Sequence, residues 1–280
     1  VINDPKKPWC TAVDWVELSL DMDAVPVVFV HGIFSDGEVG WAGASMVQQI
    51  DGLGLPNSGT EVSLGVGGLI NGLGTFASRL PELTKFIDGY KDRWGMNQLT
   101  LVAHSRGGLD ARNYITSAAE SILQLVQIAT PNAGSPVMPS GGKSTGGQKP
   151  PYNRRKSTSE LGTKAMGEFN KTHKFPADIV GLVSIAGHAK TIGKDENETA
   201  CGAPYLNLMN GISPDADERI NGRLPASDGL VPVSSAHALS EAVNVPEVVS
   251  VTPGDIRACH TRLQRDSSAA MTTGIEYIKH

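Results

Sequence analysis

The chain has 280 residues, of which 40% are hydrophobic and 19% are charged, and its formal net charge is −5 at pH 7. This composition is ordinary for a globular protein, and the length fits one α/β domain with an insertion. The negative balance argues against a nucleic-acid-binding surface, which needs clustered Lys and Arg, and no apolar run of about 18 residues predicts a membrane span.

The N-terminal residues 1–24 are mixed in character and predict a lead-in that packs on the body, with a short strand at 15–20. Residues 25–280 are expected to form one domain, because neither an internal repeat nor a second core is visible. The chain begins at Val1 without a charged-then-apolar leader, so either a signal segment has been removed or the sequence has been trimmed. We expect a secreted protein rather than a cytoplasmic one.

The three cysteines, Cys10, Cys201 and Cys259, lack the C-x-x-C spacing that is typical of zinc sites. No phosphate-binding glycine motif follows a predicted strand, so we expect neither a metal nor another cofactor. If the protein is exported, Cys201 and Cys259 are the pair that we expect to form a disulfide. Three reduced thiols are the alternative.

Residues 25–30 are a continuous apolar run, which is typical of a strand covered on both faces of a sheet. The run leads into His31, Gly32 and Ile33, and a turn-rich stretch follows. A His-Gly pair at the carboxyl end of a buried strand can turn a backbone N–H towards a reacting group. A glycine that only permits a turn is the alternative.

Three elements are predicted next: a short helix at 41–50, a short strand at 60–64, and a helix from Phe76 to Tyr90 in which apolar residues recur at helical spacing. The loop at 65–74, before the last of these elements, is rich in glycine and carries no charge. It either lines a substrate groove or serves only for packing.

The stretch 99–109 passes from an apolar strand through Ser105 and two glycines into a helix predicted at 109–120. A serine at a sharp strand-to-helix turn is held in a strained conformation that exposes its hydroxyl, and small neighbours let the strand and the helix pass closely. Ala103 and Gly107 give the pattern A-x-S-x-G, which differs from G-x-S-x-G by one methyl group. A tight turn with an idle serine and a phosphate-binding loop are the alternatives.

After a strand predicted at 123–130, the composition changes. Residues 136–176 begin with a stretch rich in Gly, Ser, Pro, Lys and Arg and end with a helix, which together predict an inserted cap; a solvated loop is the alternative. Further strands are predicted at 179–186 and 248–252, before a helix at 265–278. Strands that alternate with helices in this way predict a mostly parallel sheet with helices on both faces.

A serine nucleophile needs an imidazole to accept its proton and a carboxylate to orient that imidazole. A sharp strand-to-helix turn that carries a serine nucleophile is called a nucleophile elbow. After such an elbow, the acid comes first in the chain and the histidine second, each at the carboxyl end of a strand. His260 lies after the last predicted strand, as this order requires, and His237 is the weaker alternative. Asp228, in a Ser-Asp-Gly turn, is preferred as the acid over Asp255, which is close to His260 in sequence.

Four motifs resemble the bacterial lipase and esterase family of the α/β-hydrolases. They are V-H-G-I-F at 30–34, A-H-S-R-G-G at 103–108, A-T-P-N-A-G-S at 129–135 and S-D-G-L-V at 227–231. The resemblance implies the α/β-hydrolase fold with Ser105, Asp228 and His260 as catalytic residues. It also implies an oxyanion hole made of the backbone N–H groups of Ile33 and Arg106, and it places a lid where the predicted cap falls.

The chain departs from that family at two points. Members that bind structural calcium have an Asp two residues after the catalytic histidine, where this chain has Arg262. They also have a cysteine soon after the catalytic Asp, where this chain has none. We therefore expect no calcium site, and any disulfide must be placed differently.

Residues and resemblance together predict an enzyme that hydrolyses carboxylic esters through an acyl-enzyme, as a lipase or carboxylesterase acting on lipid-like esters. The expected partners are an ester substrate and a lipid interface, without nucleic acid. Acyl transfer or polyester depolymerisation by the same residues is one alternative. A binding protein that has kept the scaffold without turnover is another.

Overall fold

The computed structural model describes residues 25–65, 72–135, 138, 152–176, 179–187, 228, 230–239, 247–251, 260, 263–265 and 278. Several predicted features lie outside these residues: the N-terminal lead-in with its strand, most of the glycine-rich loop, all three cysteines, Asp255 and nearly all of the C-terminal helix. Within the described part, no helix is both long and apolar enough to cross a membrane.

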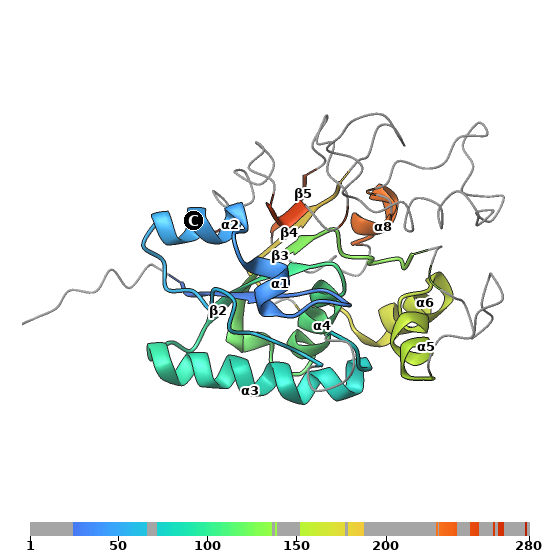
Figure 1. Cartoon of the computed structure of the whole chain (residues 1–280), viewed down its shortest axis with the longest axis horizontal. Helices are drawn as coiled ribbons and strands as arrows, with labels where there is room; N and C mark the ends of the chain where they lie inside the picture. Colours follow the sequence, from blue (N-terminus) through green and yellow to red (C-terminus); the bar gives the residue numbers. More distant parts are fainter. Residues whose placement is uncertain are drawn as a thin grey trace, which may run out of the picture.

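Five strands form the described sheet and lie side by side in the order of the sequence (Figure 1). They are β1 (Val27–Val30), β2 (Leu99–His104), β3 (Ile122–Ile128), β4 (Gly181–Ile185) and β5 (Glu247–Val251). Every neighbouring pair is parallel, so the carboxyl ends of the strands meet at one edge of the sheet. The predicted parallel sheet is confirmed.

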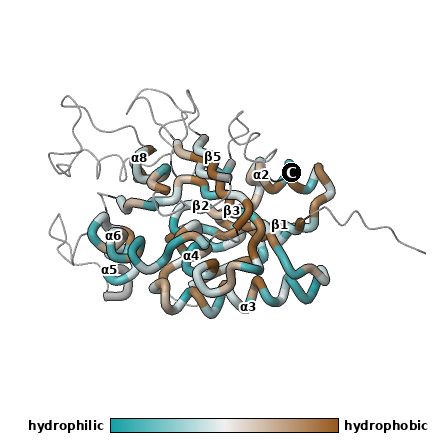
Figure 2. The backbone as a smooth tube through the Cα atoms, turned by 180° about the vertical axis from the view of Figure 1, so that it is seen from behind, coloured by the Kyte–Doolittle hydropathy of each residue, from teal (hydrophilic) through white to brown (hydrophobic). Residues whose placement is uncertain are grey.

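Helices cover both faces of this sheet, as predicted. On one face pack α3 (Phe76–Trp94) and α4 (Arg106–Ile115), and on the other pack α1 (Gly37–Trp41) and α2 (Ser45–Gly52). The remaining described helices are η1 (Ala119–Ser121), α5 (Tyr152–Ser159), α6 (Thr163–Thr172), α8 (Val233–Ala236) and η5 (Leu263–Arg265). Hydrophobic residues gather in the strands between the two helical layers (Figure 2).

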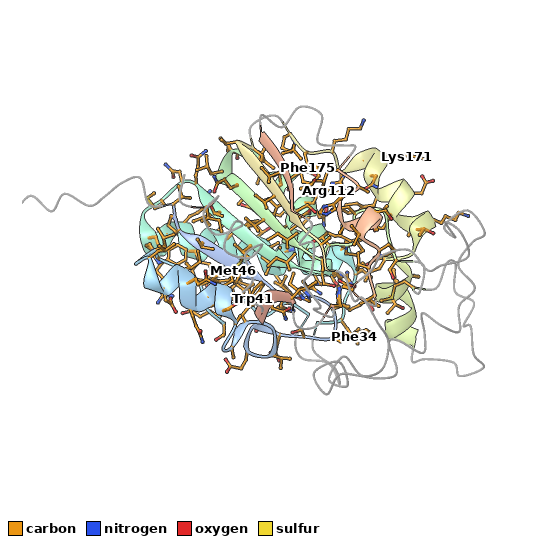
Figure 3. The ribbon with its side chains drawn as sticks, turned by 90° about the horizontal axis from the view of Figure 1, so that it is seen from above. Phe34, Trp41, Met46, Arg112, Lys171 and Phe175 are labelled. Carbon is orange, nitrogen blue, oxygen red and sulfur yellow. The ribbon has the colours of Figure 1, made fainter. Side chains whose placement is uncertain are left out.

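The core has two parts because successive residues of a strand point to opposite faces of the sheet. In β1, Val28 and Val30 join the cluster under α3 and α4, while Val27 and Phe29 join the cluster under α1 and α2. Trp41 of the second cluster, labelled in Figure 3, is fully buried with its ring 4.9 Å from that of Phe29. Burial on both faces explains the continuous apolar run of this strand.

Two local predictions are wrong. The strand predicted at 60–64 is a loop, because the N–H of Leu64 donates to the His31 ring, at 2.8 Å, instead of to a neighbouring strand. The single helix predicted at 41–50 is two helices, α1 and α2. Gly43 lies between them in a left-handed conformation with φ 66°, which no helix continues through.

The predicted helix from Phe76 is confirmed and extends to Trp94 as α3. Thr75 caps its start through a capping box, in which the Thr75 and Ser78 side chains each accept the other residue's N–H. Gly95 ends it in a left-handed conformation with φ 65°. The buried side of this helix covers the sheet ahead of the strand that leads into Ser105.

Candidate active site

Ser105 lies between β2 and α4, where the backbone turns sharply. It has φ 56° and ψ −129°, a conformation that costs a non-glycine residue about 1–3 kcal/mol. Its N–H donates to the carbonyl of Ile128 at 2.7 Å, which holds the turn at the carboxyl end of β3. Strand, turn and helix follow one another as expected, but the helix is shifted: it begins at once, at Arg106, three residues before the predicted start, and ends at Ile115, five residues before the predicted end.

Glycines are required after the serine because α4 passes very close to the sheet. A Cβ atom on Gly107 would lie 2.5 Å from the carbonyl oxygen of Val30, and one on Gly108 would lie 2.0 Å from Thr130 Oγ1. Both separations are far inside van der Waals contact, so a side chain at either position would push the helix away. Ala103, at the first small position of the A-x-S-x-G motif, lies in β2 and is fully buried.

A continuous hydrogen-bonded chain joins three side chains that are far apart in the sequence. His260 Nε2 lies 2.7 Å from Ser105 Oγ, and His260 Nδ1 lies 2.8 Å from Asp228 Oδ2. All three residues are buried. Because a carboxylate oxygen accepts, Nδ1 carries the imidazole proton and Nε2 is left to accept from the serine hydroxyl. The structure thus brings the three predicted residues together, and their catalytic roles stay a prediction.

Both carboxylate oxygens of Asp228 are used. Oδ1 accepts from the N–H groups of Leu230 at 2.9 Å and Val231 at 2.7 Å, while Oδ2 faces His260. Backbone donors of the turn therefore fix the rotation of the carboxylate, and the carboxylate in turn orients the imidazole ring. One side chain both closes a turn and contacts the histidine.

The loop after β3 holds the segment that carries Asp228. Ser135 Oγ donates to the carbonyl of Leu230 at 2.6 Å, and Asn132 Nδ2 donates to that of Ala236 at 2.8 Å. Both polar side chains are buried. Neither residue has a role among the predictions from the sequence, although both belong to the motif A-T-P-N-A-G-S. Polar residues directly after a core strand are the feature that could have indicated one.

The alternative residues lie elsewhere. His237 follows α8 directly, and its Nδ1 lies 3.1 Å from Ser184 Oγ on β4. The competing acid, Asp255, lies outside the described residues. In the part of the chain that the structure describes, no group of three or more His, Cys, Asp or Glu side chains is placed to hold a metal ion.

Two backbone amides were predicted to form an oxyanion hole near Ser105. Arg106 is the first residue of α4, where a helix has N–H groups without an intrahelical acceptor and the positive end of its dipole. A Cβ atom on Gly32 would lie 2.9 Å from Ser105 Cβ, so the backbone that leads to Ile33 passes directly against the serine. The Ile33 amide thus follows the backbone that borders Ser105, and the Arg106 amide follows Ser105 itself. Their role as an oxyanion hole stays a prediction.

His31 fixes this backbone. Its Nδ1–H donates to the carbonyl of Gly32 at 2.8 Å, and its Nε2 accepts from the N–H of Leu64 at 2.8 Å. Burial, together with the positive charge of Arg79, lowers the pKa of His31 to about 3, so the ring is neutral and each hydrogen bond keeps its direction at neutral pH. His31 is thus a structural support for the loop after β1.

No protein-family model matches the sequence, and no curated protein matches it. Solved structures do match. The mature lipase BlEst2 of Bacillus licheniformis has a TM-score of 0.62 at 16% identity, covering 92% of this chain and 93% of that chain. The metagenomic carboxyl esterase MGS0156 has a TM-score of 0.60 at 16% identity, covering 99% of this chain and 82% of that chain. The chain has the α/β-hydrolase fold.

A third structure, Est1E from Butyrivibrio proteoclasticus with ferulic acid bound, has a TM-score of 0.51 at 14% identity, covering 92% of this chain and 88% of that chain. The likeness to all three lies in the fold. The α/β-hydrolase fold that the four sequence motifs implied is confirmed.

Three buried charged side chains, Arg79, Arg106 and Asp110, form a network with the partly buried Glu160 beside the elbow of this α/β-hydrolase fold. The Asp110 carboxylate of α4 lies 3.0 Å from Arg79 Nη2 and 3.8 Å from Arg106 Nε. Arg106 Nη2 lies 3.0 Å from Glu160 Oε2. Burial raises the pKa of Asp110, while the two guanidinium groups oppose that shift. Arg79 also donates to the carbonyl of His31 at 3.3 Å, so the network ties the end of β1 to α4.

The side chain of Arg106 also reaches the segment that was predicted as a cap. Its Nη1 donates to the carbonyl of Ser157 at 3.2 Å, and its guanidinium lies over the Phe76 ring, 4.8 Å from the centroid. For Arg106, the sequence predicts a role of the backbone amide only. The Arg106 side chain is fully buried. Because arginine is usually exposed, the amino-acid sequence does not indicate this burial.

Proposed function

We propose that this protein is a serine hydrolase that cleaves carboxylic esters through an acyl-enzyme, as a lipase or carboxylesterase of lipid-like esters. The observation that carries the proposal is the buried chain from Ser105 through His260 to Asp228, with successive separations of 2.7 and 2.8 Å. The match to the folds of a lipase and a carboxyl esterase supports it.

Acylation begins when Ser105 Oγ attacks the carbonyl carbon of the ester and His260 Nε2 takes the hydroxyl proton. Asp228 stabilises the resulting imidazolium through the hydrogen bond at Nδ1. The bond between the carbonyl carbon and the alcohol oxygen then breaks, and His260 gives its proton to the departing alcohol. The acyl group remains on Ser105.

Deacylation repeats these steps with water. The water oxygen attacks the acyl carbon while His260 takes one of its protons, and that proton returns to Ser105 as the carboxylic acid leaves. In both halves the amides of Ile33 and Arg106 bind the negatively charged oxygen of the tetrahedral intermediate. Each such donor lowers the barrier by about 3–4 kcal/mol.

Apolar side chains next to the loop after β1 support a lipid-like substrate. Ile33 packs against a buried apolar cluster that α4 shares with the segment after α5. The cluster consists of Leu109, Leu161, Met166 and Phe169. The next residue, Phe34, is 38% exposed and is labelled in Figure 3. Apolar side chains that follow the backbone bordering Ser105 favour an apolar acyl chain over a polar one.

Hydrolysis of p-nitrophenyl esters with increasing acyl length tests the proposed substrate class. We expect kcat/KM to rise at least about tenfold from acetate to medium chains, because each buried CH₂ group contributes about 0.8 kcal/mol. Turnover of acetate alone would remove lipid-like esters from the proposal. Failure to hydrolyse any ester in the series would remove the hydrolase itself.

Gly32→Ala is expected to lower kcat by about 10- to 100-fold, because a displacement of about 1 Å near the reacting atoms has an effect of this size. The new methyl group would lie 2.9 Å from Ser105 Cβ, so the serine or the loop must move. Gly89→Ala in α3 is the matched control, since a Cβ atom there meets nothing within 4 Å. Steady-state kinetics of both variants check the prediction, and equal kcat values would contradict it.

A further inference from the structure

His104, the last residue of β2, is buried beside His260 and takes no part in the steps described above. The two rings lie 4.9 Å apart, centroid to centroid, with an interplanar angle of 44°. The Nε2 atom of His104 lies 2.7 Å from the backbone carbonyl oxygen of His260. A side chain of the strand that leads into Ser105 therefore reaches the main chain of the proposed base.

This hydrogen bond has one possible direction. A carbonyl oxygen only accepts, so Nε2 of His104 carries the proton and donates it. Burial and the neighbouring ring of His260 lower the pKa of His104 to about 3, which keeps the ring neutral at neutral pH. A neutral ring adds no second positive charge beside His260 when that residue takes the serine proton.

Two hydrogen bonds to described residues hold the backbone of His260. Its N–H donates to the carbonyl of Asp228 at 3.0 Å, and its carbonyl accepts from His104 at 2.7 Å. The backbone at this position is a turn, outside the helices and strands of the described residues. Among the described residues, these two bonds and the side-chain contacts to Ser105 and Asp228 hold the imidazole in place.

We infer that His104 is a positioning residue, whose Nε2–H holds the backbone carbonyl of His260 so that the imidazole stays within reach of Ser105 Oγ. The inference rests on the proposed function, in which His260 is the base. Because β2 carries His104 and leads directly into the serine, one rigid strand places the nucleophile and anchors the base.

The matched test variants are His104→Gln and His104→Met, whose side chains have similar lengths while only Gln has an N–H donor. For the full chain with Met, we expect kcat on a p-nitrophenyl ester to fall about 10- to 100-fold with KM changed by less than about twofold, because the base is displaced while substrate binding is kept. Gln should restore most of the loss. Melting temperatures of both variants show whether a loss of kcat follows from a damaged fold.

A second readout does not depend on activity. The Nδ1 proton of His260, shared with Asp228, is expected to give a low-field proton NMR resonance that His260→Ala removes. We expect the resonance in the wild type and in His104→Gln, and its broadening or loss in His104→Met. His104→Phe, which keeps a ring without a donor, replaces Met in the comparison if that variant does not fold.

The two readouts separate the inference from the proposed function. A resonance that depends on the donor at position 104, in a protein that turns over no ester, would support the anchor and remove the hydrolase. Equal kcat values and equal resonances in the Gln and Met variants would overturn the inference. An equal loss of kcat in both would overturn it too, because the donor would then not be the property that matters.

Discussion

Ser105→Ala is expected to lower kcat for ester hydrolysis by about 10⁶-fold, which leaves no enzymatic turnover above background. The change removes the oxygen atom that attacks the ester, and neither His260 nor Asp228 can replace it as the nucleophile. Replacing the buried hydroxymethyl group by a methyl group leaves the backbone hydrogen bond from residue 105 to Ile128 in place, so the elbow should still form. Steady-state hydrolysis of a medium-chain p-nitrophenyl ester measures the loss.

Ser117→Ala is the matched control for this prediction. Ser117 is exposed just beyond the C-terminal end of α4, where its hydroxyl donates to the carbonyl of Tyr114 at 2.9 Å. We expect this variant to keep wild-type kcat. If Ser105→Ala kept an activity close to that of Ser117→Ala, Ser105 would not be the nucleophile.

Asp228→Asn is expected to lower kcat by about 10⁴-fold, because it changes the tautomer of the base. The Asn oxygen can still accept from Leu230 and Val231, as Oδ1 does now. That arrangement turns the amide NH₂ group towards His260 Nδ1, which must then accept. The ring proton moves to Nε2, and a protonated Nε2 cannot accept from the serine hydroxyl.

The control for this substitution is Asp51→Asn. Asp51 is exposed in α2, where its carboxylate accepts from Asn57 Nδ2 at 2.8 Å. Its replacement should change neither kcat nor the pH profile. A kcat for Asp228→Asn within about tenfold of this control would contradict the role of the carboxylate, since tautomer control accounts for a far larger factor.

The sequence was sufficient for the five strands of the described sheet and for the three residues of the hydrogen-bonded chain, because both follow from recognisable patterns. A long apolar run predicts a strand covered on both sides, as in β1. Strand, serine and glycines in succession predict the turn at Ser105, and chain order then selects Asp228 and His260. Parallel strands bring their carboxyl ends to one edge of the sheet. Ser105 follows β2 at that edge, and Asp228 lies against Gly187, just after β4.

Features that depend on tertiary contacts were missed. The alternating pattern at 60–64 resembles a strand, yet the partner of the Leu64 N–H is the ring of His31. Neither the buried side chain of Arg106 nor the anchor at His104 has a local sequence pattern. Each is defined by groups more than 50 residues away, Glu160 in the first case and His260 in the second.

Reaction of the purified protein with a fluorophosphonate, followed by mass spectrometry of its peptides, tests the central claim most directly. A serine activated by a neighbouring imidazole reacts with this reagent, whereas an idle serine does not. We expect a single covalent adduct on Ser105 in the wild type and a strongly slowed reaction in His260→Ala. An unmodified Ser105 in the folded wild-type protein would contradict the assignment of Ser105 as an activated nucleophile.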